Sequence, residues 1–69
     1  MQTIKNNYSN IIEVSIVMPC LNEEETIGAC VKKAFKAIQE NGIEGEVIIS
    51  DNGSTDKSVE IANKEGAKI

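Results

Sequence analysis

Two short apolar runs stand out in the pattern of hydrophobic and polar positions. Residues 14–18 (VSIVM) and 47–49 (VII) are nearly continuous runs of Val, Ile and Met. Apolar runs this short, bounded by Pro or Gly, favour strands that are buried on both faces of a parallel sheet. Proline has no N–H to donate to a neighbouring strand, so Pro19 is expected to end the first of them.

The stretch between the two runs has the spacing of an amphipathic helix. Its apolar residues recur at intervals of three and four and would form one stripe facing a core, namely Ile27, Cys30, Val31, Ala34, Phe35 and Ile38. The lysines at positions 32, 33 and 36 would lie on the opposite side. Asn41-Gly42 is typical of the C-terminal end of a helix.

The start of this helix has its own signals. Asn22 is a favourable N-cap residue, and Glu25 follows three positions later as in a capping box. Three acids in a first turn, residues 23–25, would also complement the helix dipole. The pattern therefore predicts a helix from about residue 23 to residue 40.

A second helix and the beginning of a third strand are expected after the second apolar run. Asn52 and Gly53 indicate a turn, and Ser54 or Thr55 could cap the helix that follows. Gly66 occupies the position of a terminating glycine. Residues 67–69 (AKI) have the composition of the start of another strand.

The order of these elements predicts an α/β fold, a partial parallel open sheet with a β-α-β-α-β order and right-handed crossovers. Sixty-nine residues allow at most one small domain. Residues 1–12 are polar and irregular, and we expect a flexible N-terminal arm there. The domain would occupy residues 13–69.

Two polar stretches, residues 19–25 and 51–56, follow the C-terminal ends of the two expected parallel strands, and ligands of open α/β sheets bind at that edge. Asp51 would therefore lie on the rim. A carboxylate there can accept hydrogen bonds from a nucleotide base, or it can cap its own loop as an Asx turn. Asp56 is expected to be a first-turn helix acid. The residues alone indicate a nucleotide-sized site of unspecified chemistry.

Charge and residue usage argue against several classes of function. The formal net charge is −4, with seven lysines, no arginine and no histidine. Such a chain repels nucleic acid and anionic membranes, so we expect no nucleic-acid partner. The Gly-rich phosphate motifs GxGxxG and GxxxxGK[ST] are absent, and a Ser-His-Asp or Cys-His set cannot form without histidine.

The two cysteines do not indicate a metal site. Cys20 and Cys30 match no CxxC pattern, and no histidine is present to complete a zinc site. We expect both to be reduced, small, buried hydrophobic residues in a cytoplasmic protein. No apolar run reaches the length of a signal-peptide core or the roughly 20 residues of a membrane span.

Two segments together resemble a known family. VSIVMPCLNEEETI, followed by EVIISDNGSTDKSVEIA, resembles the opening of the family 2 glycosyltransferases, which are inverting enzymes of the GT-A (Rossmann-like) fold. The resemblance runs from about Val14 to Ile69. The segment MPCLNEEETI is most similar to the corresponding segment of the branch that transfers a sugar to polyprenyl or dolichyl phosphate.

The resemblance implies a nucleotide site on particular positions. Pro19, Cys20, Leu21 and Asn22 would hold the nucleotide, and Glu23 would lie near its ribose or base. Asp51 takes the place of the first aspartate of the family's D-D-G-S element, which hydrogen-bonds the base edge. Asn52 replaces the second aspartate, so we assign it no metal role, although with Gly53 it keeps the turn.

The resemblance also implies a parent enzyme that transfers a sugar from a UDP- or GDP-sugar to an acceptor, such as a lipid phosphate at the cytoplasmic face of a membrane. Mg²⁺ or Mn²⁺ would neutralise the diphosphate through a D-x-D motif that these 69 residues lack, as they lack the catalytic base. We therefore expect an N-terminal, truncated part of the enzyme, inactive and self-associating by itself. The alternatives are a non-catalytic nucleotide- or partner-binding module and, less favoured without a Gly-rich basic loop, a nucleotidyltransferase.

Overall fold

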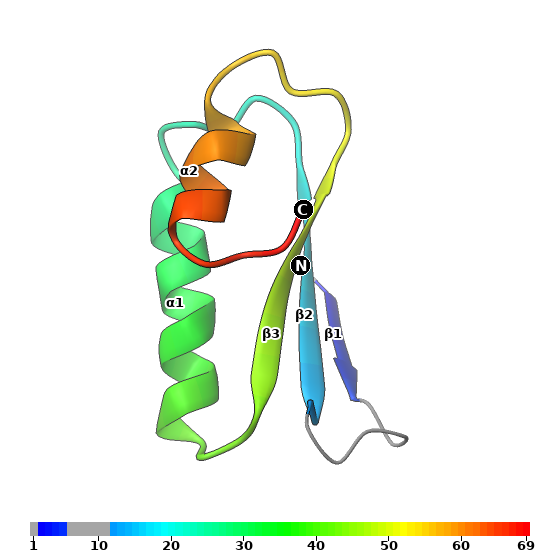
Figure 1. Cartoon of the computed structure of the whole chain (residues 1–69), viewed down its shortest axis with the longest axis vertical. Coiled ribbons are helices and arrows are strands. Elements are labelled where there is room, and N and C mark those ends of the chain that lie inside the picture. The colour runs from blue at the N-terminus through cyan, green and yellow to red at the C-terminus, as the bar shows by residue number, and fades with distance from the viewer. Residues whose placement is uncertain (1, 6–11) are drawn as a thin grey trace.

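The computed structural model describes residues 2–5 and 12–69. Within them the elements are β1 (Gln2–Lys5), β2 (Val14–Cys20), α1 (Ile27–Glu40), β3 (Gly45–Asp51) and α2 (Ser58–Lys64). The strands form one sheet in the order β1-β2-β3, and both helices lie on the same side of it (Figure 1). β2 and β3 are parallel. The predicted α/β open sheet is confirmed.

The register of β2 and β3 aligns the ends of the two strands. Val14 lies opposite Gly45, and Cys20 lies opposite Asp51 at the other end. Beyond β3, Lys68 forms an isolated parallel bridge with Ile48, through hydrogen bonds to the neighbouring residues of β3. The expected third strand is therefore present in the described residues as a one-residue bridge, on the side of β3 away from β2.

The prediction of an irregular arm is wrong for Gln2–Lys5. These residues form β1, which pairs antiparallel with β2 from Val17 back to Val14. The outer edge of β2 exposes backbone N–H and carbonyl groups, and a polar segment can satisfy them because an edge strand needs no apolar face of its own. The rest of the expected arm, apart from Ile12, lies outside the described residues.

Pro19 does not end β2, which continues through Cys20. The Cys20 carbonyl accepts the Asn52 N–H at 2.9 Å, so the polar backbone groups of Cys20 point towards β3. These directions alternate along a strand, and the nitrogen of Pro19 therefore points away from β3. The pairing with β1 ends at Val17. Proline is tolerated at such a position because, among the described residues, no strand pairs with it on that side.

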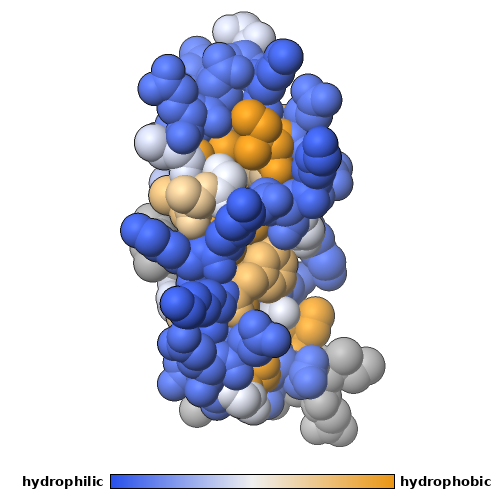
Figure 2. All heavy atoms as spheres, turned by 90° about the vertical axis from the view of Figure 1, so that its left-hand side faces the viewer, coloured by the Kyte–Doolittle hydropathy of each residue, from blue (hydrophilic) through white to orange (hydrophobic). Residues whose placement is uncertain are grey.

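The core lies between the sheet and the two helices. Alternate residues of β2 and β3 point into it, and the α1 stripe packs against them; its buried hydrophobic residues are Ile16, Met18, Cys20, Ile27, Val31, Ala34, Ile38, Val47, Ile49, Ala62 and Ala67. On the helix side the surface is mostly hydrophilic, with hydrophobic residues showing in patches (Figure 2). Phe35 is half-buried at the margin of the core. Cys20 is buried as expected, whereas Cys30 is exposed because it lies at the edge of the stripe.

The N-terminal end of α1 differs from the prediction. The helix begins at Ile27, with Thr26 in the N-cap position and no side-chain cap, and its first turn contains no acid. Residues 23–26 instead form a turn in which the Ile27 N–H donates to the Glu23 carbonyl at 2.9 Å. The capping box of Asn22 and Glu25 is thus wrong, because Asn22 binds a distant part of the chain.

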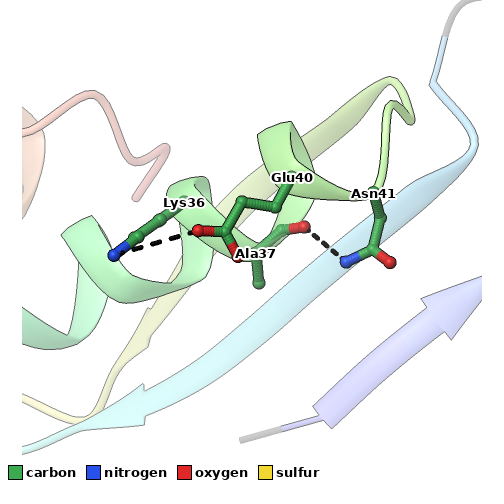
Figure 3. Close-up of polar contacts among 4 residues, drawn as sticks. All are labelled: Lys36, Ala37, Glu40 and Asn41. Carbon is green, nitrogen blue, oxygen red and sulfur yellow. Dashed lines mark hydrogen bonds and ion pairs between the residues drawn. The ribbon is translucent and has the colours of Figure 1, made fainter.

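The C-terminal end of α1 agrees with the prediction. Asn41 is the C-cap residue, and its side-chain amide donates to the Ala37 carbonyl at 2.7 Å (Figure 3). Gly42 then turns the chain with a φ of +63°, which favours glycine. Lys36 and Glu40 form an exposed ion pair at 3.8 Å, a contact of little energetic weight.

The second helix is shorter than its sequence signals suggest. It begins at Ser58 with Lys57 in the N-cap position, so neither Ser54 nor Thr55 caps it. Both residues are instead engaged with the loop that follows β2. Gly66, with a φ of +100°, follows the C-cap residue Glu65 and ends the helix as predicted.

Candidate functional site

Two loops meet at the edge of the sheet where β2 and β3 end (Figure 1). We call residues 21–26 exit loop 1 and residues 52–57 exit loop 2. The Asn52 N–H donates to the Cys20 carbonyl at 2.9 Å, which extends the strand pairing into the first residue of exit loop 2. The prediction that the two polar stretches share one edge is confirmed.

Asn22 joins the two loops. Its backbone has a φ of +49°, a left-handed conformation that asparagine tolerates better than most residues. Its side-chain oxygen accepts the Thr55 N–H at 2.8 Å and the Asp56 N–H at 3.4 Å. The side chain that would have capped α1 therefore caps the backbone of exit loop 2.

Asp51 caps its own loop, as the Asx-turn interpretation predicted. One carboxylate oxygen accepts the Ser54 hydroxyl at 2.5 Å, and the other accepts the N–H groups of Ser54 at 3.0 Å and Gly53 at 3.2 Å. These bonds stabilise the carboxylate, and the Ser54 hydroxyl contributes most to lowering the pKa of Asp51 below its usual value. The same hydroxyl accepts the Asn22 N–H at 2.9 Å.

Asp56 and Ser58 form a second arrangement of the same kind. Asp56 precedes α2 rather than lying in its first turn. One of its oxygens accepts the Ser58 hydroxyl at 2.5 Å and the Ser58 N–H at 2.9 Å, and the hydroxyl contributes most to lowering the pKa of Asp56. Ser58 is fully buried and its hydroxyl accepts the Glu23 N–H at 2.7 Å. We did not predict a role for Ser58; the Asp-x-Ser spacing before a helix was the available signal.

The surface of this edge is acidic with an apolar component. The three acids of residues 23–25 are exposed, and Glu24 accepts the Lys57 N–H at 3.3 Å. Leu21 is 54% exposed, an unusual exposure for a large hydrophobic side chain in this chain, and Pro19, two positions earlier, is also exposed. This combination suits a ligand that offers N–H or O–H donors and a flat apolar face, and it disfavours an unscreened phosphate.

Within the described residues no three Asp, Glu, Cys or His side chains are placed so that they could hold a metal ion. Glu24 accepts the Lys57 N–H and Asp56 accepts the Ser58 hydroxyl and N–H, so the described acids of the exit loops do not fit the Mg²⁺ or Mn²⁺ that the family resemblance implies. In the same part of the chain, no helix is long and apolar enough to cross a membrane.

All the predicted nucleotide-binding positions lie at this edge: Pro19, Cys20, Leu21, Asn22, Glu23, Asp51, Asn52 and Gly53. They differ in what they can offer a ligand. Cys20 is only 1% exposed, so its side chain belongs to the core. Leu21, Asn22 and Glu23 are exposed, as are Asn52 and Gly53. Their role in nucleotide binding stays a prediction.

Comparison with known proteins agrees with this arrangement. The low-salt glycan biosynthesis hexosyltransferase of Haloferax volcanii is 44% identical over 56 residues, which cover 81% of this chain and 13% of that protein. The glucosyl-3-phosphoglycerate synthase of Mycolicibacterium smegmatis is 43% identical over 81% of this chain and 18% of its own length. The undecaprenyl-phosphate 4-deoxy-4-formamido-L-arabinose transferase of Photorhabdus laumondii is 38% identical over 80% of this chain and 17% of its own length.

This chain therefore spans less than a fifth of the length of these three relatives. No solved structure is significantly similar to it. The sequence profile of the family described as "Glycosyl transferase family 2" matches residues 15–68, from the second residue of β2 to the bridge at Lys68. Because that match includes both parallel strands, both helices and both exit loops, the chain belongs to glycosyl transferase family 2.

Proposed function

We propose that this chain is the nucleotide-recognition segment of a glycosyltransferase that moves a sugar from a UDP- or GDP-sugar to an acceptor. The observation that carries the proposal is the meeting of the two exit loops at the C-terminal edge of the parallel strands, within the part of the chain that matches the family. Open α/β sheets bind their ligands at this edge.

The chemistry of the edge supports recognition of the nucleoside half of the donor. The bonds from Ser54 and Gly53, within the described part of the chain, occupy three of the roughly four acceptor positions of the Asp51 carboxylate. The Cys20 thiol also contributes a hydrogen bond to this carboxylate, and in our proposal an N–H of the base would compete with it for the remaining position. Leu21 offers an exposed apolar surface against which a base can pack. The acids of residues 23–25 favour ribose hydroxyls over phosphate oxygens.

Stabilising the diphosphate and activating the acceptor require groups outside the two exit loops. A diphosphate leaving group requires positive charge in the transition state, and the two exit loops supply mainly acids. In our proposal, Mg²⁺ or Mn²⁺ is held elsewhere in the intact protein, and a separate carboxylate removes the proton of the acceptor. A polyprenyl phosphate is the acceptor we favour, because one of the similar proteins is named as an undecaprenyl-phosphate transferase.

Titration of UDP and of GDP into the ¹⁵N-labelled chain, followed by NMR, tests the proposal. We expect the amide signals of Leu21 to Glu23 and of Asn52 and Gly53 to shift. Asp51→Ala should raise the dissociation constant about tenfold, the scale of one charge-assisted hydrogen bond. Glu40→Ala is the matched control, because it removes an acid at the opposite end of α1 that forms an exposed ion pair with Lys36. Unchanged affinity in Asp51→Ala would contradict the role of Asp51.

A non-catalytic binding module is the alternative function. It would bind the same nucleotides or a protein partner, so titration alone does not separate the two functions. Transfer of a labelled sugar from a UDP- or GDP-sugar by the intact protein supports the transferase. Binding without transfer, with each nucleotide sugar and with Mn²⁺ or Mg²⁺ supplied, supports the module.

A further inference from the structure

The backbone of exit loop 1 is held by side chains of the following segment rather than by its own. Three consecutive N–H groups donate across the edge: that of Asn22 to the Ser54 hydroxyl at 2.9 Å, that of Glu23 to the Ser58 hydroxyl at 2.7 Å, and that of Glu24 to the Asp56 carboxylate at 3.1 Å. The three acceptors lie 32 to 35 positions farther along the chain. The shape of exit loop 1 therefore depends on residues 54–58.

Both serines are held in one hydrogen-bonding orientation. A hydroxyl has one proton, and it can rotate to suit its neighbours. The Ser54 proton is directed to Asp51 and the Ser58 proton to Asp56, each across 2.5 Å. An ionised carboxylate can only accept, so each hydroxyl turns its lone pairs towards the N–H of exit loop 1. Each aspartate thus fixes the loop through a serine.

Burial strengthens the hydrogen bonds that Ser58 makes with Asp56 and with the Glu23 N–H. Ser58 has no exposed surface, and its hydroxyl donates to Asp56 and accepts the Glu23 N–H. A hydrogen bond in such a place is not replaced by water when one partner is removed. The start of α2 does not depend on the hydroxyl, because the Ser58 N–H donates separately to Asp56 at 2.9 Å.

We propose that Ser54 and Ser58 are positioning residues, which hold the backbone of Asn22 and Glu23 in the conformation that the nucleotide meets. The inference rests on the proposed function and deepens it, since neither serine needs to touch the ligand. A loop held in its bound conformation loses less entropy on binding, which appears directly as affinity. Removing either hydroxyl should weaken binding while the fold stays intact.

The test uses UDP and GDP with the variants Ser54→Ala and Ser58→Ala. Each should raise the nucleotide dissociation constant about fivefold, the scale of one neutral hydrogen bond. The amide hydrogen of Asn22 should exchange faster in Ser54→Ala, and that of Glu23 in Ser58→Ala. Ser54→Thr retains the hydroxyl and should restore both affinity and protection. Ser50→Ala is the matched control, because Ser50 is exposed on β3 and adjoins Asp51 in sequence.

The outcomes separate the inference from the proposed function. Weaker binding in both alanine variants while they remain folded, with rescue by Ser54→Thr, supports the positioning role. If the wild-type chain binds a nucleotide and the folded alanine variants bind equally well, the inference is wrong and the proposed function stands. If the wild-type chain binds neither UDP nor GDP, both are wrong. Should one alanine variant fail to fold, the other decides, because the two serines act on different N–H groups.

Discussion

Gly45, the first residue of β3, offers a quantitative test of how α1 packs on the sheet. A Cβ atom added at this position would lie 2.8 Å from Cδ1 of Ile38 and 2.9 Å from both its Cγ1 and Cγ2. Two of these three atoms are bonded directly to the Ile38 Cβ, so rotation of the outer side chain cannot relieve the contact. Gly45→Ala should therefore force a shift of the whole side chain or of the strand.

The expected magnitude follows from two opposing effects. Overpacking of this kind costs about 1–3 kcal/mol, whereas alanine is favoured over glycine inside a strand by about 0.5–1 kcal/mol. The net loss in the free energy of unfolding should lie between about 0 and 2.5 kcal/mol, with about 1 kcal/mol at the middle of the two ranges. In an Ile38→Ala background the clash disappears, and the same Gly45→Ala change should stabilise the chain by about 0.5–1 kcal/mol. The sign of the effect reverses.

Urea denaturation of the four proteins in this double-mutant cycle provides the measurement. Ile38→Ala alone should cost about 2 kcal/mol or more, a large part of the stability of a small domain. All four are therefore compared at one fixed concentration of trimethylamine N-oxide, which stabilises folded states. A coupling energy of about 1–3 kcal/mol is expected for residues in contact. If the cycle shows no coupling between the Gly45→Ala and Ile38→Ala changes, Ile38 does not lie against the start of β3.

Three further predictions concern the core, the pH response and the open sheet. Val31 is fully buried in α1, so Val31→Asp should unfold the chain, and an unchanged circular-dichroism melting curve would show that another face of α1 is buried. The pKa values of Asp51, Asp56 and Glu46 are all lowered in the folded chain, so their stabilisation is present above the unfolded pKa values and is lost as the pH falls from about 4.5. Thermal melting from pH 7 to pH 3 checks this. In Glu46→Gln the melting temperature should fall less over the same pH range. Both helices cover one side of the sheet, so the isolated chain should self-associate through the other side, and sedimentation that shows only monomer at ~100 μM would contradict this.

The features that depend on local spacing were predictable from the sequence. The stripe of α1 was confirmed at Ile27, Val31, Ala34 and Ile38, because a period of three to four residues leaves few other ways to bury those side chains. The C-terminal ends of both helices were placed correctly by glycines with positive φ. The position of Asp51 on the rim followed from the parallel order of the strands alone.

The features that depend on distant parts of the chain were not predictable. Asn22 has the sequence context of an N-cap, but its side chain binds Thr55 and Asp56, more than thirty residues away. Capping preferences describe competition among neighbouring backbone groups, and they contain no information about a loop brought alongside by the sheet. β1 was missed for a similar reason, since an edge strand is selected by the unpaired edge of β2 and not by its own composition.

The structure also changes how the acidic character of the segment is understood. The residues alone left Asp51 open between a contact with a base and an Asx turn, and in the structure most of its acceptor capacity serves Ser54 and Gly53. Asp56 is used in the same way by Ser58. These two aspartates therefore shape the loops, while they stay ionised and the exposed acids of residues 23–25 keep the edge unfavourable for an unscreened phosphate. An acidic chain can accordingly contribute the nucleoside side of a nucleotide-sugar site, provided that the cation for the diphosphate is held elsewhere.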